Sequence, residues 1–156
     1  LVRATKTAEI LCEAIGADYE TAEGFNNICI GVWENRLKAE LAEECPEMWD
    51  TWLNRPEELI IEGGESLDAV KERSLKALAK VIEEREGETL AIVGHRGVLK
   101  PMLAGALQVA KPCYWRLHFD TASYSVLTHD HIHGYCLMGL NYTEHLKDIP
   151  IIQEFD

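Results

Sequence analysis

The sequence predicts an α/β domain in which helices cover a largely parallel sheet. Three observations predict this class. An apolar run at 90–93 has the length of a buried strand and leads through a glycine into a helix. A long amphipathic helix comes just before that run, and two strand-like segments, 123–128 and 135–140, follow later as a hairpin. Strands and helices that alternate in this way are typical of α/β proteins, and the hairpin should lie at one side of the sheet.

The first part of the chain is predicted to be mostly helical. Ala4, Ala8, Leu11 and Ile15 recur at helical spacing, and Gly16 is placed to end the helix that they define. Apolar and polar residues then mix irregularly, which predicts a loop. The segments expected next are a loop at 26–32, a helix at 35–44 and a short helix at 46–53.

The clearest helix lies between Ser66 and Gly87. Ser66 is a good N-cap, apolar residues recur behind it at helical spacing, and Gly87 stops the pattern. The strand at 90–93 follows directly. A glycine-flanked turn then opens another helix, in which we expect Pro101 to occupy the first turn, where proline is tolerated.

Composition bounds the class of protein. A chain of 156 residues that is 47% hydrophobic can bury a real core, and we expect one domain over 1–156. Its net charge of -12 argues against nucleic acid and against an anionic membrane surface as partners. A small phosphorylated substrate remains compatible with this charge, because a local cluster of Arg and His can reverse the field inside one cleft.

The five cysteines are odd in number, widely spread and free of any C-x-x-C pair. Such a pattern is typical of reduced thiols, so we expect a cytoplasmic protein. The sequence has no run of membrane-spanning length and no secretory segment at its start. Leu1 is not a methionine, which leads us to expect further residues upstream.

His95 is the first candidate for chemistry. It lies where the strand at 90–93 gives way to a helix, and ligands of α/β proteins sit just beyond the carboxyl ends of strands. The free amides of a helix start would also meet an anion there. The alternative is a histidine that only forms a hydrogen bond within the turn, and this segment alone does not decide between the two.

Five segments together resemble successive landmarks of the histidine phosphatase superfamily, the phosphoglycerate mutase-like proteins. They are 1–10, 30–34 (Ile-Gly-Val-Trp-Glu), 63–67 (Gly-Gly-Glu-Ser-Leu), 93–98 (Val-Gly-His-Arg-Gly-Val) and 140–146. The chain looks most similar to the small phosphatases of the α-ribazole and broad-specificity type. This resemblance implies a three-layer αβα sandwich with a mostly parallel sheet, from which the family's first central strand is absent in this sequence.

The resemblance also implies a mechanism and roles for particular residues. In this family a neutral imidazole attacks a phosphate monoester, and water then hydrolyses the phosphohistidine, without a cofactor. Arg3 falls on an arginine that clamps phosphate, and His95 on the second histidine, which donates to the phosphoryl group. Arg96 either adds a phosphate contact or points to solvent. Ala122 and Ser123 fall where a backbone amide near the pocket often contributes.

Two departures from the family pattern matter. The nucleophile of the family lies in an Arg-His-Gly motif, which this sequence does not contain, so we expect that motif upstream of Leu1. The proton donor to the leaving group is usually a glutamate, and Asn27 stands at its position. An amide cannot supply a proton in that way, which leaves Asn27 as a substrate contact. Glu34 is the substitute acid to consider, although its usual reading is structural.

Three histidines near the expected hairpin tip invite a metal-site interpretation. His129, His131 and His133 alternate, so on a strand they would share one face. Because Asp130 and Gly134 lie among them, a solvated turn is the better interpretation, and we expect no metal site.

We therefore predict hydrolysis of a small phosphate monoester. A relative that binds a phosphorylated ligand or a protein partner without catalysis is the alternative, and Asn27 favours it most. Phosphate transfer of the mutase type is a third option. A homodimer is left open.

Overall fold

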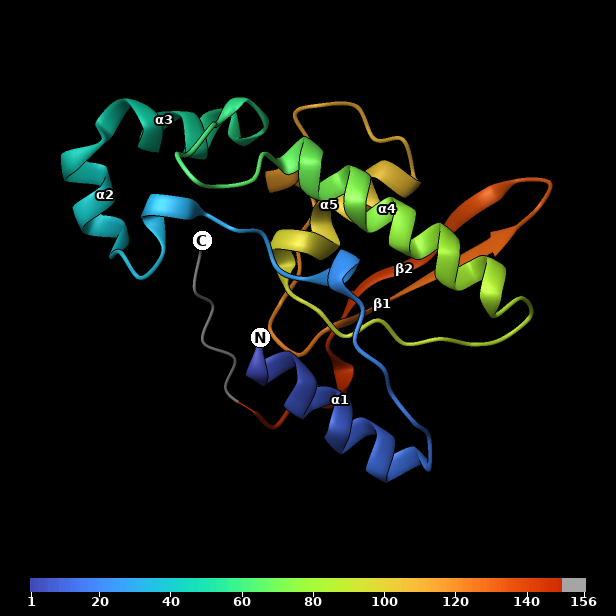
Figure 1. The fold of residues 1–156 in the computed structure, drawn as a ribbon. Helices are drawn as coiled ribbons and strands as arrows, with labels where there is room; N and C mark the ends of the chain where they lie inside the picture. Colours follow the sequence, from blue (N-terminus) through green and yellow to red (C-terminus); the bar gives the residue numbers. More distant parts are fainter. Residues whose placement is uncertain (150–156) are drawn as a thin grey trace.

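The computed structural model describes residues 1–149 (Figure 1). Its helices are α1 (Val2–Ile15), α2 (Lys38–Glu44), α3 (Pro46–Asn54), α4 (Leu67–Glu84) and α5 (Arg96–Ala106), and its strands are β1 (Tyr124–Asp130) and β2 (Gly134–Tyr142). The short 3-10 turns are η1 (Glu23–Phe25), η2 (Gly31–Trp33), η3 (Pro56–Glu58), η4 (Tyr114–Arg116) and η5 (Glu144–Leu146).

Local sequence signals explain the end of α1 and the start of α4. Gly16 ends α1 in the left-handed conformation, with φ 67°, as its position predicted. The hydroxyl of Ser66 accepts a hydrogen bond of 3.1 Å from the N–H of Ala69 and so caps α4. α2 begins later than expected, because Asn35 has a left-handed φ of 60° and cannot continue a helix.

The expected position of Pro101 was wrong. α5 begins directly after His95, its N-cap residue, so Pro101 lies inside the helix and not in its first turn. Because proline has no N–H, the carbonyl of Gly97 loses the hydrogen bond that residue 101 would otherwise give it. Pro101 is nevertheless buried within α5.

The sheet differs from the prediction. Within residues 1–149 the sheet consists of β1 and β2, which pair antiparallel as the expected hairpin. The segment 90–93 has no regular secondary structure and pairs with no strand in this part of the chain, and Leu90 is 40% exposed. A mostly parallel three-layer sandwich is therefore not found among the described residues, because a parallel ladder needs a neighbouring strand on at least one side.

The packing of α4 against α5 forms the centre of the molecule (Figure 1). Val70 on α4 and Val98 on α5 are completely buried, and Leu78 and Leu103 are nearly so. The hairpin of β1 and β2 lies beside these helices, and α1 lies apart from α2 and α3. None of the helices in residues 1–149 is both long and apolar enough to cross a bilayer.

The segment between residues 30 and 64, here called the excursion, carries α2 and α3 and has a small core of its own. Hydrogen bonds join its two ends. Ile30 and Gly64 form an isolated antiparallel bridge, and the N–H of Val32 donates to the carbonyl of Glu62 at 3.0 Å. The buried residues of this core are Trp33, Leu41, Leu59 and Ile61, with Ile30, Met48, Trp49 and Trp52 packed against them. Both ends of the excursion are therefore held at one place, beside the candidate site.

Candidate active site

The start of α5 fixes the backbone of His95. The carbonyl of His95 accepts hydrogen bonds from the N–H groups of Val98 and Leu99, at 3.0 and 2.9 Å. The first amides of this helix and the positive end of its dipole favour an anion at the same place. The local fold therefore presents the His95 side chain where a phosphate group would be attracted.

Arg3 lies close enough to His95 to affect its ionisation. Burial first, and then the positive charge of Arg3, hold the pKa of His95 below its ordinary value of 6.5. Arg3, in the first turn of α1, thus lies within electrostatic range of His95 at the start of α5, although the two are far apart in the sequence. The roles of Arg3 and His95 in binding phosphate remain predictions.

Two polar atoms at this position are buried without a partner. His95 Nε2 and Asn27 Oδ1 have no hydrogen-bond partner among residues 1–149. Gly97, in the first turn of α5, leaves room for the amide: a Cβ atom there would lie 2.6 Å from Asn27 Oδ1. Because an unsatisfied buried polar atom costs about 1–3 kcal/mol, the pair is suited to meet a polar ligand.

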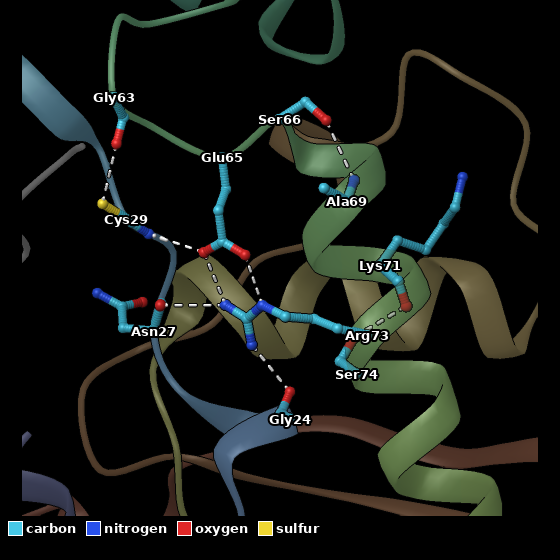
Figure 2. A network of polar contacts seen from close by, with 10 residues as sticks. All are labelled: Gly24, Asn27, Cys29, Gly63, Glu65, Ser66, Ala69, Lys71, Arg73 and Ser74. Atoms are coloured by element: carbon cyan, nitrogen blue, oxygen red, sulfur yellow. Dashed lines mark hydrogen bonds and ion pairs between the residues drawn. The ribbon is translucent and has the colours of Figure 1, made fainter.

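A polar network holds the loop that carries Asn27 (Figure 2). Arg73 on α4 binds Glu65 through two hydrogen bonds, Nε to Oε1 at 2.7 Å and Nη2 to Oε2 at 3.0 Å. Its remaining N–H groups donate to the carbonyls of Gly24, at 2.9 Å, and Asn27, at 3.1 Å. Neither Arg73 nor Glu65 was predicted to be part of the site, although Glu65 lies in one of the segments on which the resemblance rests.

Glu34 supports its own turn. Its Oε1 atom accepts a hydrogen bond of 3.2 Å from the N–H of Ile30, across η2, and its side chain is exposed. This contact agrees with the structural reading of Glu34. A role for Glu34 as the acid is still a prediction.

The segment that precedes β1 lies near Arg96. A hydrogen bond from Asn141 is the main cause that holds the pKa of Asp120 below its usual range, and the charge of Arg96 also lowers it. Ser123 donates to the Asp120 carbonyl through both its N–H, at 3.3 Å, and its hydroxyl, at 2.9 Å. The Ser123 amide is therefore already used by the turn. Ala122 has a left-handed φ of 59°.

The carbonyl of Ala122 accepts a hydrogen bond of 3.0 Å from His145 Nε2. This contact ties the turn before β1 to η5 at the end of the hairpin. A contact between substrate and the backbone of Ala122 or Ser123 remains a prediction.

The histidines of the hairpin tip bind carboxylates. His131 Nε2 lies 2.8 Å from Glu86, and His133 Nδ1 lies 3.2 Å from Asp130. Within residues 1–149, no group of three or more His, Cys, Asp or Glu side chains has an arrangement that could hold a metal ion. These contacts give the histidines ordinary surface partners.

The lowered pKa of His95 predicts a dependence of stability on pH. In the unfolded chain the histidine titrates near 6.5, so below that pH the unfolded state binds a proton that the folded state does not. The free energy of unfolding should therefore fall as the pH decreases from about 7.5 to about 5.5, and less so in His95→Asn. Urea midpoints of both proteins at the two pH values measure this. An equal fall in both proteins would contradict it.

Comparisons with known proteins show the family to which the chain belongs. The chain matches the histidine phosphatase superfamily (branch 1) over residues 1–140. It is 30% identical to phosphoserine phosphatase 1 of Hydrogenobacter thermophilus, over 97% of this chain and 71% of that protein. It is 24% identical to the adenosylcobalamin/alpha-ribazole phosphatase of Escherichia coli, over 81% of this chain and 63% of that protein.

A solved structure and longer relatives complete the comparison. The structure of YhfR from Bacillus stearothermophilus superimposes with a TM-score of 0.86 at 25% identity, over 93% of this chain and 72% of that one. Mycobacterial relatives that are 33% identical are much longer, and the chain covers 34% of their length. The fold is thus that of the phosphoglycerate mutase-like phosphatases. From its motifs, its fold and its relatives alike, the chain belongs to branch 1 of the histidine phosphatase superfamily.

Proposed function

We propose that this protein hydrolyses small phosphate monoesters through a phosphohistidine intermediate. One observation carries the proposal: His95 Nε2 is buried without a partner among residues 1–149, beside Arg3 and at the start of α5. Such a donor and a guanidinium suit the equatorial oxygens of a phosphoryl group. The names of the relatives support hydrolysis of phosphate esters, because the Hydrogenobacter and Escherichia proteins are both phosphatases.

The proposed reaction has two steps. An imidazole nitrogen attacks phosphorus, the P–O bond to the leaving group breaks, and the leaving oxygen takes up a proton. Water then attacks the phosphohistidine, the P–N bond breaks, and inorganic phosphate and the free imidazole result. Because the sequence has no Arg-His-Gly motif, we assign the attacking imidazole to a segment outside this sequence.

In this scheme Arg3 and His95 hold the transferred group. Arg3 offers the planar fork that matches two phosphate oxygens, and His95 donates through Nε2. Arg96 and the N–H of Ala122 provide further contacts, whereas the N–H of Ser123 already donates to the carbonyl of Asp120. Asn27 contacts the substrate, and Glu34 is the candidate acid. The five free thiols suit a reducing compartment such as the cytoplasm.

Trapping the intermediate tests the mechanism. The full-length natural protein, mixed with a radiolabelled phosphate monoester and quenched in alkali, should carry phosphate on histidine, since a P–N bond is cleaved by acid but survives alkali. Tandem mass spectrometry should place the label on a histidine outside residues 1–156 of this sequence. A label on His95 would reverse the assignment of nucleophile and donor. Turnover without any labelled protein would show that the reaction does not pass through a phosphohistidine.

A second candidate is a relative that binds phosphorylated ligands without hydrolysis. Asn27 favours it, because the amide stands where a proton donor is expected. The two candidates are separated by turnover of an activated ester such as p-nitrophenyl phosphate. Its leaving group departs without a proton, so a phosphatase that lacks an acid still hydrolyses it and a binding protein does not.

A further inference from the structure

We propose that the Glu65–Arg73 ion pair is a positioning device that fixes Asn27 against the start of α5, and that turnover depends on it through Asn27. The inference rests on the proposed function, since it assigns a role within the same site. It concerns residues that do not themselves touch the substrate.

The ion pair holds the Asn27 loop from two sides. Arg73 donates to the backbone carbonyl of Asn27 itself and to that of Gly24. Glu65 accepts a hydrogen bond of 3.0 Å from the N–H of Cys29, and its own N–H donates to the Cys29 carbonyl at 2.8 Å. The backbone is thus anchored before, at and after Asn27 (Figure 2).

The chemistry of the pair suits this task. The guanidinium uses its fork on the carboxylate and still has N–H groups for two carbonyls, which an ammonium on a flexible stem cannot match. The side chains of Arg73 and Glu65 are only 26% and 29% exposed, so solvent screens them less than a surface pair. Hydrogen bonds from Arg73 hold the pKa of Glu65 below its ordinary range. The carboxylate therefore stays charged and the ion pair stays formed.

The anchored backbone of Asn27 places its side chain against the start of α5. Asn27 Oδ1 lies against Gly97, two residues after His95 along the first turn of α5. A catalytic site is sensitive to such placement, since a misplacement of about 1 Å can lower a rate about 10²-fold. Breaking the Glu65–Arg73 ion pair should therefore lower the rate of turnover more than it lowers the stability of the fold.

A double-mutant cycle tests the proposal. Arg73→Met should lower kcat for p-nitrophenyl phosphate about tenfold or more, with a smaller change in KM. In an Asn27→Ala background the same change should lower kcat by less than about twofold, because the side-chain amide that the ion pair positions is no longer present. Arg73→Lys should restore part of kcat, since it keeps the charge but loses the fork.

Three comparisons keep the result specific. Arg85→Met removes another arginine at the end of α4, whose contact with Glu88 is exposed and 4.0 Å long, and it should leave kcat unchanged. If Arg73→Met does not fold, Glu65→Gln, which keeps the size of the side chain, is carried through the same cycle. If Arg73→Met lowers kcat by the same factor in the unaltered and in the Asn27→Ala background, the ion pair is structural and the proposal is wrong.

Failure of the proposed function can be told apart from failure of this inference. If the unaltered full-length protein shows no turnover, the proposed function is wrong, and the cycle is then measured through the affinity for vanadate, detected by tryptophan fluorescence. If Arg73→Met lowers the affinity for vanadate and this loss disappears in the Asn27→Ala background, the result still supports a positioning role for the ion pair. An equal loss in both backgrounds overturns it.

Discussion

His95→Ala is expected to lower turnover of p-nitrophenyl phosphate about 10²–10³-fold, the usual effect of removing one preorganised donor from a developing oxyanion. The physical reason is that His95 Nε2 is buried beside Arg3 and has no other hydrogen-bond partner among residues 1–149. Binding of vanadate should weaken as well. Steady-state kinetics and inhibition by vanadate measure the two effects in the full-length protein.

His129→Ala is the matched control for this change. His129 is exposed at the hairpin, so its removal should leave both turnover and vanadate binding unaltered. If His95→Ala kept more than about a tenth of the turnover, His95 would not be a donor to the phosphoryl group and the site would have to be placed elsewhere.

Asn27→Glu is expected to raise hydrolysis of alkyl phosphates about 10²–10⁴-fold, which is the usual contribution of a positioned acid. An alkoxide needs a proton to leave, and an amide does not provide one. The Asn27 side chain reaches a buried position, and burial raises the pKa of a carboxyl group, so the new glutamate would hold its proton there. Rates for p-nitrophenyl phosphate should gain nothing from the new acid, because its leaving group departs without a proton, and they should fall as far as the Asn27 amide itself contributes to turnover.

Asn27→Gln separates acid catalysis from side-chain size. It lengthens the side chain as glutamate does but carries no acidic proton, so alkyl phosphates should react as slowly as with asparagine. A protein that only binds its ligand would hydrolyse neither ester, before or after Asn27→Glu. Fast hydrolysis of an alkyl phosphate by the unaltered protein would point to another acid, with Glu34 tested first.

The sequence predicted those elements whose ends are decided locally. Gly16 ends α1 because glycine adopts the left-handed conformation, and Ser66 begins α4 because its hydroxyl accepts a hydrogen bond from the helix backbone. The hairpin was predicted from the strand-like pattern of its two segments. The segment 90–93 shows the limit of such reasoning. An apolar run has the composition of a strand, but pairing depends on a neighbour, and none pairs with it among the described residues.

The same limit applies to the site. Arg3 and His95 could be found because each lies in a local motif, and the structure places them near one another. The link between Arg73 and the carbonyls of Gly24 and Asn27 could not be found in this way. It joins residues 49 and 46 positions apart, and nothing in the sequence marks a backbone carbonyl as an acceptor for a particular arginine.

The bridge between Ile30 and Gly64 has a consequence for how this scaffold can vary. Both ends of the excursion that carries α2 and α3 are fixed at one point, and the excursion has its own apolar core. Doubling the length of such a closed loop adds only about 0.6 kcal/mol of entropic cost. The segment between residues 30 and 64 can therefore be lengthened, shortened or exchanged as one unit, because the bridge that closes it lies outside the part that changes.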